Sequence, residues 1–333
     1  MSTMSFHWVG HDVTVMCDSM NVSCSQTLNG HTDRVWCVKF NNKGNYLASS
    51  SSDLTIRVWS TDSNGSFQPV AVLTEGHNRT IRSLSWSPDD KMLASASFDG
   101  VINIWKCNDD WEVIAALEGH ENEVKCVSWS FSGQYLASCG RDKSVWIWEI
   151  EDDDYECAAV LNEHSQDVKC VSWHPSTDML FSGSYDSTIK LFSIVGDEFE
   201  CANTLTSHNS TVWAVEPNAT GDLLASCSSD CTVKIWSSDI TPTNYICIHT
   251  FSNVHSLPIY HISWCNLTGI IASCSGDNSI CFIAQKGDIY DVILKQQSAH
   301  ERDVNHVNWN PKRRGLLASC SDCSDIKLWN INL

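Results

Sequence analysis

Basic residues are scarce in this chain of 333 residues. Lys and Arg together number 21 against 40 Asp and Glu, so the formal net charge is −19. A field of that sign repels phosphate groups, which disfavours binding to generic DNA, RNA or anionic membranes. No run of eighteen apolar residues occurs, and the first twenty residues lack a basic start followed by an apolar run. We therefore expect neither a transmembrane span nor a secretory signal.

Recognisable catalytic motifs are missing as well. The sequence has no glycine-rich phosphate loop, no His-Glu-x-x-His pair and no nucleophile elbow. Cysteine, in contrast, is abundant, with 17 residues, an odd number. Because no secretory signal is expected, reduced thiols in the cytosol or nucleus are favoured over disulfides.

One repeat organises the chain from residue 22 to residue 333. Seven histidines recur at a spacing of 43 to 47 residues, and an aspartate follows each of the first six by 22 residues. Six residues further on stands an aromatic residue in five of these copies, whereas the sixth copy has Ile283. The histidines are His31, His77, His120, His164, His208, His255 and His300. These units resemble WD repeats, which predicts an all-β fold, a seven-bladed β-propeller with four short antiparallel strands per blade.

Spacing within the repeat predicts how the propeller is built. The fourth and seventh residues after each histidine are apolar, and a separation of three breaks strand alternation, so we expect a β-bulge between them. The last repeat ends after its third strand. Residues 22–28 (VSCSQTL) precede His31 as an outer strand would, so we expect them to complete the last blade and close the ring. The propeller is then one domain, residues 21–333, and residues 1–20 form a mobile extension.

Recurring Ser, His and Asp could suggest a nucleophilic triad. In WD repeats, however, these residues and the strand Trp form a structural hydrogen-bond chain inside each blade, and repetition argues against a single active site. In the second blade we expect this chain to consist of His77, Ser97, Asp99 and Trp105. The pattern lapses at Gly140 in blade three. It lapses again at Cys323 in blade seven, so that blade is expected to be less well tied together.

Cysteines follow the same repeat. Eleven of the 17 occupy three recurring strand positions, where a free thiol serves as a small apolar filler. Equivalent positions on different blades cannot converge on one tetrahedral metal site. The single Cys-x-x-Cys, Cys320 to Cys323, is a weak signal, and we predict no metal ion and no cofactor.

Two positions of each repeat are expected on the upper rim of the ring. The residue before the turn aspartate is Ser52, Phe98, Arg141, Tyr185, Ser229 or Gly276 in blades one to six. The residue five after each histidine is Trp36, Arg82, Lys125, Lys169, Trp213, Tyr260 or Asn305. Basic residues thus concentrate on blades two to four, beside a row of aromatic residues, and both kinds serve as interface anchors.

We therefore predict a partner-binding surface on this rim. Its residues are Arg141, Arg82, Lys125, Lys169, Phe98, Tyr185, Trp36, Trp213 and Tyr260. The expected ligand is an acidic peptide or a free chain terminus, with Arg141 pairing with a carboxylate. The alternative is that these side chains merely lean on their neighbours and pair with loop carboxylates.

Several segments resemble one family of WD-repeat proteins more closely than WD repeats in general. LEGHENEVKCVSW (117–129), SCGRDKSVWIWE (138–149) and EHSQDVKCVSWHPS (163–176) are similar to cytosolic iron–sulfur protein assembly WD-repeat proteins. EGHNRTIRSLSWSP (75–88), ASASFDG (94–100) and VNWNPKRRGLLASCSD (307–322) extend the resemblance to the second and last blades.

The resemblance implies a non-enzymatic subunit of the complex that targets iron–sulfur clusters to cytosolic and nuclear apoproteins. The implied partners are a HEAT-repeat scaffold, a small adaptor subunit, a hydrogenase-like cluster carrier and apo iron–sulfur client proteins. In that family the arginine of RDKSVW is a functional surface position, which corresponds to Arg141. The implied location is the cytoplasm, with the nucleus as a second site.

Two other functional classes stay open at this point, because propellers serve many functions. A substrate receptor of a ubiquitin ligase would use the same rim, although no extra recruiting domain and no Trp-Asp-x-Arg sequence at a blade end is present. A propeller hydrolase would need a polar catalytic cluster at the central channel, and the sequence reveals none.

Overall fold

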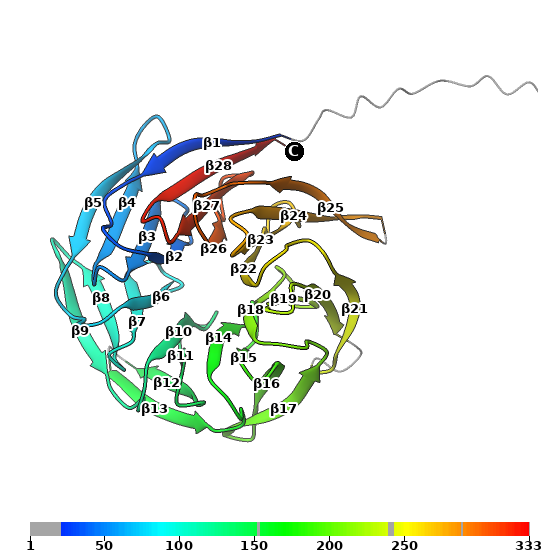
Figure 1. The fold of residues 1–333 in the computed structure, drawn as a ribbon. Coiled ribbons are helices and arrows are strands. Elements are labelled where there is room, and N and C mark those ends of the chain that lie inside the picture. Colours follow the sequence, from blue (N-terminus) through cyan, green and yellow to red (C-terminus); the bar gives the residue numbers. More distant parts are fainter. Residues whose placement is uncertain (1–20, 152–153, 239–242, 288, 333) are drawn as a thin grey trace, which may run out of the picture.

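A computed structural model describes residues 21–151, 154–238, 243–287 and 289–332. Over these residues the chain forms 28 strands, arranged as seven antiparallel four-stranded sheets around a central axis (Figure 1). This is the predicted seven-bladed propeller. Within the same residues, no helix is long and apolar enough to cross a membrane. The extension expected at residues 1–20 lies outside the described residues.

Each blade runs from an inner strand A to an outer strand D, and the strands have these bounds. The A strands are β2 (Val35–Phe40), β6 (Ile81–Trp86), β10 (Val124–Trp129), β14 (Val168–Trp173), β18 (Val212–Pro217), β22 (Ile259–Trp264) and β26 (Val304–Trp309). The B strands are β3 (Tyr46–Ser51), β7 (Met92–Ser97), β11 (Tyr135–Gly140), β15 (Leu180–Ser184), β19 (Leu223–Ser228), β23 (Ile271–Ser275) and β27 (Leu316–Ser321). The C strands are β4 (Ile56–Thr61), β8 (Ile102–Cys107), β12 (Val145–Glu151), β16 (Thr188–Val195), β20 (Val233–Ser238), β24 (Ile280–Lys286) and β28 (Ile326–Asn332). The D strands are β5 (Phe67–Leu73), β9 (Trp111–Leu117), β13 (Asp154–Leu161), β17 (Glu198–Thr206), β21 (Tyr245–Phe251), β25 (Ile289–Gln296) and β1 (Asn21–Leu28).

The ring closes through β1, which pairs antiparallel with β28 and completes blade seven (Figure 1). The predicted closing strand is therefore confirmed. A side-chain amide adds a second link at this junction. Gln26 Nε2 donates to the Phe67 carbonyl at 2.7 Å, and its Oε1 accepts from the Phe67 N–H at 2.9 Å. Strand β1 thus completes the sheet of blade seven and also links that blade to blade one.

The apolar core lies between neighbouring blades rather than at a single centre. One cluster joins blades five and six through residues such as Ile235 and Ile262, and a similar one joins blades six and seven through Phe282 and Val307. The cysteines of the second strands lie completely buried in these layers, namely Cys139, Cys227, Cys274 and Cys320. All sixteen described cysteines are free thiols.

The filler interpretation fails for the outermost strands. Cys24, Cys157 and Cys247 are exposed and Cys201 is half-buried, because the outer strand of a blade has no neighbour on its far side. In that position the thiol forms weak local contacts instead. Cys247 Sγ, for example, lies 3.5 Å from the carbonyl oxygen of His249.

Every blade contains the expected contacts of histidine with serine and aspartate, but with a different serine. The tryptophan link is present in five blades, because blades four and six carry Phe192 and Ile283 at that position. In blade two His77 Nε2 accepts from Ser95 Oγ at 2.7 Å, and Trp105 Nε1 donates to the same oxygen at 2.8 Å. His77 Nδ1 lies 3.0 Å from Asp99 Oδ2. Ser97, the predicted member, instead donates to the Arg79 carbonyl and accepts the Asp99 N–H. Ser95 and Ser97 are two apart and share one face of the strand, so spacing alone could not choose between them.

This correction removes the expected gap in blade three. Ser138 supplies the hydroxyl to His120 and Trp148 there. Gly140 corresponds to Ser97 rather than to Ser95, so blade three lacks only the hydroxyl that caps the turn.

Blade seven is also complete, contrary to expectation. His300 Nδ1 lies 2.8 Å from Asp325 Oδ1, and His300 Nε2 lies 2.6 Å from Ser319 Oγ. The loop before β27 is one residue longer than in other blades, which shifts the register. Cys323 then occupies the aspartate position, and Asp325 takes the place where five other blades carry threonine or serine. Cys323 Sγ donates to Asp325 Oδ1 at 2.8 Å, so the thiol and the carboxylate have exchanged roles.

The corrected assignment predicts different costs for two neighbouring alanine substitutions. Ser95→Ala leaves the buried His77 and Trp105 nitrogens without a partner, which we expect to lower the free energy of unfolding by about 3 kcal/mol. Ser97→Ala removes only a turn cap, with an expected loss of about 1 kcal/mol. Urea unfolding followed by tryptophan fluorescence measures both. A larger loss for Ser97→Ala would contradict the assignment.

Candidate protein-interaction surface

A β-bulge opens strand A of every blade, as the spacing predicted. The register between β10 and β11 shifts between Val124 and Cys126, and the other six blades repeat this shift. The residue between the two therefore has no ladder partner, and a bulge turns such a side chain away from the sheet. The seven bulged residues are Trp36, Arg82, Lys125, Lys169, Trp213, Tyr260 and Asn305.

Backbone hydrogen bonds bring a second set of residues beside these bulges. Arg141 N–H donates to the Glu123 carbonyl at 2.9 Å, two residues before the bulged Lys125. In blade seven the corresponding bond runs from Asp322 to the Asp303 carbonyl at 3.1 Å, so Asp322 is the member that sequence left ambiguous. The second set is Ser52, Phe98, Arg141, Tyr185, Ser229, Gly276 and Asp322. We call the two sets together the upper rim.

Two cations of the upper rim stack on aromatic rings of the preceding blade. The Arg82 guanidinium lies 4.9 Å from the ring centroid of Trp36, and Lys125 Nζ lies 3.8 Å from that of Phe98. A cation over an aromatic face is stabilised by about 0.5–2 kcal/mol. The basic residues of blades two and three therefore not only lie beside aromatic residues but stack on them.

The stacking continues into blades five and six. Lys169 Nζ lies 5.4 Å from both the Tyr185 and the Trp213 ring centroids. Trp213 in turn meets Tyr260 edge to face, with centroids 5.4 Å apart. Eight of the nine predicted partner-binding residues thus form stacked pairs, and Arg141 is the exception.

Five of these residues also line one small cavity at the mouth of the central channel. They are Arg82, Lys125, Lys169, Trp213 and Tyr260, and the cavity measures about 80 Å³. Burial, against the attraction of Glu123 and with added repulsion from Lys169 and Arg82, lowers the pKa of Lys125 to about 8. Among the described residues no carboxylate forms an ion pair with Arg82 or Lys125. The mouth therefore favours an anionic group.

Arg141 lies apart from the stacked residues and is mostly exposed. Its side chain is 59% exposed, and its Nη1 lies 3.4 Å from both Glu123 carboxylate oxygens. Arg79 donates to the same carboxylate at 3.2 Å. Partial burial would raise the pKa of Glu123, but backbone donation, Lys125 and Arg79 hold it below its usual range. Since exposed ion pairs contribute little, the Arg141 guanidinium is free to exchange Glu123 for a partner's carboxylate.

Sequence reasoning missed the acidic side chains on this surface. Glu123 pairs with Arg141, Asp167 lies 3.1 Å from Lys169 Nζ, and Asp303 accepts from the Tyr260 hydroxyl at 3.2 Å. All three occupy the loop that leads into strand A, three residues after the repeat histidine. A comparison of the seven residues at that repeat position would have revealed these acidic side chains.

One group of metal-capable side chains occurs within the described part of the chain. It consists of His300, Cys323 and Asp325, and does not include Cys320. The His300–Asp325 contact is the same structural pair that the other six blades form. The arrangement therefore has a structural explanation.

Comparison with known proteins assigns the repeats and the relatives of this chain. The family model "WD domain, G-beta repeat" matches residues 22–60, 67–106, 111–149, 155–193, 199–237, 245–283 and 292–330. The "Probable cytosolic iron-sulfur protein assembly protein Ciao1" of Culex quinquefasciatus is 45% identical over 327 aligned positions, covering 91% of this chain and 96% of that protein. "Protein CIA1" of Arabidopsis thaliana is 52% identical over 338 positions, covering 92% of this chain and 95% of that protein.

Proposed function

Since the chain belongs to the WD40-repeat family, and within it to the cytosolic iron–sulfur protein assembly proteins, we propose that it is a non-enzymatic adaptor. Its task is to hold partner proteins and apoprotein clients together so that iron–sulfur clusters reach the clients. The proposed partners are a HEAT-repeat scaffold, a small adaptor subunit and a hydrogenase-like cluster carrier. The proposed location is the cytosol, with clients in the nucleus as well.

The observation that carries the proposal is the composition of the upper rim. A chain of formal charge −19 gathers three stacked cations and the exposed Arg141 on one surface. Stacking holds the rings and cations in place before a partner arrives, which reduces the entropy lost on binding. We infer that an acidic peptide or a free carboxyl terminus of a client or partner docks here, with Arg141 pairing with a carboxylate.

A charge reversal at Arg141 tests this role. In a quantitative pull-down from cytosolic extract, Arg141→Glu is expected to recover iron–sulfur clients or targeting subunits at least about tenfold less well than wild type. Lys143→Glu is the matched control, because it makes the same charge change two residues away at an exposed turn position. Circular dichroism verifies that all three proteins are folded.

Each outcome of this pull-down has a distinct meaning. Equal recovery by Arg141→Glu and wild type would move recognition away from the rim. Failure of every bait to recover assembly proteins would overturn the adaptor proposal. Recovery of ubiquitin-ligase subunits instead would favour a substrate receptor.

A further inference from the structure

A second ring of side chains lines the lower part of the central channel. It consists of the eighth residue after each repeat histidine, on strand A, and every member borders one of two overlapping cavities. We call it the lower ring. Its members are Lys39, Ser85, Ser128, Ser172, Glu216, Ser263 and Asn308. Five members are small and uncharged, and the other two carry opposite charges.

Three of the five small members have a structural task. Ser85 Oγ accepts the Trp129 N–H at 3.1 Å, and Ser263 Oγ accepts the Trp309 N–H at 3.3 Å. Asn308 Oδ1 does the same for the next blade around the ring, at 2.9 Å from the Phe40 nitrogen. In these three blades a side-chain oxygen at this position thus links one blade to the next.

Lys39 and Glu216 do not take part in this link. An ammonium group has no acceptor atom, and within the described residues Glu216 forms no hydrogen bond to the following blade. Unlike Ser85, Ser263 and Asn308, these two positions place a charge in the channel. A link between blades therefore does not account for either charge.

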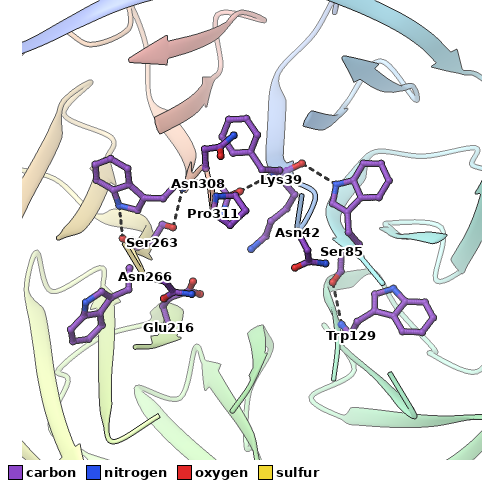
Figure 2. Close-up of a pocket in the computed structure, with 14 residues that line it drawn as sticks. Lys39, Asn42, Ser85, Trp129, Glu216, Ser263, Asn266, Asn308 and Pro311 are labelled. Carbon is purple, nitrogen blue, oxygen red and sulfur yellow. Dashed lines mark hydrogen bonds between the residues drawn. The ribbon is translucent and has the colours of Figure 1, made fainter. Parts of the chain in front are cut away.

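The two charges lie on opposite sides of the channel. Lys39 belongs to blade one and Glu216 to blade five, which is the largest separation that a ring of seven blades allows. Figure 2 shows both side chains reaching into the central opening from different sides. No ion pair or hydrogen bond links either charged group to another described residue. Burial raises the pKa of Glu216 even though Lys39 opposes the rise, as expected of a carboxyl group without a donor.

The cavity between them has the size of a small-molecule site. Two connected spaces of about 280 and 560 Å³ share Lys39, Asn42 and Glu216. Indole rings of Trp86 and Trp129 line both spaces, and side-chain amides add donors and acceptors. Polar groups that converge in a concave site can fix the orientation of a bound ligand.

We propose that the channel at the lower ring binds a small zwitterion. Its carboxylate lies toward Lys39, its ammonium toward Glu216 and its hydrocarbon spacer along the indole rings. Both charges of such a ligand meet a complementary group, whereas an anion or a cation alone would leave one protein charge unpaired. Lys39 and Glu216 also border the small cavity below the upper rim. The proposed ligand is a small molecule rather than a protein, so this inference does not depend on the adaptor role.

A series of zwitterions of increasing length tests the site. The probes are the ω-amino acids from glycine to 6-aminohexanoate, titrated into the full chain by calorimetry or NMR. We expect one spacer length to bind best, and the matched alkyl carboxylate and alkylamine to bind at least about tenfold more weakly. The best length then measures the gap between the two charges.

Three variants separate recognition from folding. Lys39→Ser with Glu216→Ser installs the residue that most other blades carry, so the protein is expected to fold normally and to lose zwitterion binding. Lys39→Glu alone is expected to abolish binding. Lys39→Glu combined with Glu216→Lys restores both charges in reversed order, and is expected to bind the same probe in the opposite orientation.

Several outcomes would overturn the proposal. One is the absence of saturable binding of any probe by wild type up to about 10 mM. Others are equal affinity for the matched carboxylate, which would indicate an anion site, or unchanged binding by the double serine variant, which would indicate adventitious contact.

Discussion

Deleting residues 1–28 will destroy cooperative folding, whereas deleting residues 1–20 will not. The longer deletion removes β1, which has seven register partners on β28 and buries Leu28. Loss of that ladder and of the Gln26 link to Phe67 is expected to cost on the order of 5 kcal/mol or more. The ring would then open at β28, and its exposed edge would favour association.

Urea unfolding and size-exclusion chromatography of the two deletions check this expectation. Residues 1–20 lie outside the repeat pattern of the sequence, so their removal is the matched control. If the protein lacking β1 stays monomeric with an unchanged unfolding midpoint, closure by this strand is not needed for stability.

Acid will unfold the protein steeply below about pH 4. Partial burial raises the pKa of each aspartate in the blade hydrogen-bond chains. Hydrogen bonds from histidine and other donors lower the same pKa by a larger amount. All seven pKa values lie below the usual range, for Asp53, Asp99, Asp142, Asp186, Asp230, Asp277 and Asp325. A depressed carboxyl pKa stabilises the fold above the pKa of the unfolded chain, and this stability is lost as pH falls.

The size of the effect follows from the number of groups. Between about pH 4 and pH 2 the unfolded chain binds up to seven protons that the folded chain does not, so stability falls by up to about 9 kcal/mol per pH unit. Burial also lowers the pKa of His208, His261, His300 and His306, which adds a shallower decline below about pH 6.5. Glu216, with its raised pKa, acts in the opposite direction, but it is a single group.

The free energy of unfolding, measured in urea from pH 7 to pH 3, checks this prediction. Asp230→Asn serves as the internal control, because it removes one titrating group and should reduce the steepest slope by one proton. A flat profile between pH 5 and pH 3 would show that the aspartates have ordinary pKa values in the folded protein.

The repeat period made the architecture predictable. Seven histidines at regular spacing require seven copies of one unit, and a unit that cannot bury its own faces must stack into a ring. The bulge between Val124 and Cys126 and the closing strand 22–28 followed from the same alignment. These features are local or repeated, so residue spacing contains them.

Residue spacing could not predict which atoms form contacts inside a blade. Ser95 and Ser97 lie on one face of one strand, and only the packed histidine and indole rings select Ser95. In blade seven, spacing pointed to a missing carboxylate, yet a one-residue shift allows Asp325 to supply it. Side chains close in space, rather than in sequence, decide such contacts.

For the functional surfaces, sequence by itself determined every residue of the upper rim except Asp322, because their repeat positions are equivalent. Only the tertiary structure decided that Lys125 stacks on Phe98 and that Arg141 shares Glu123 with Arg79, since these pairs join different blades or loops. The opposition of Lys39 and Glu216 across the channel has the same origin. Their positions in the repeat are identical, and only closure of the ring places blade one opposite blade five.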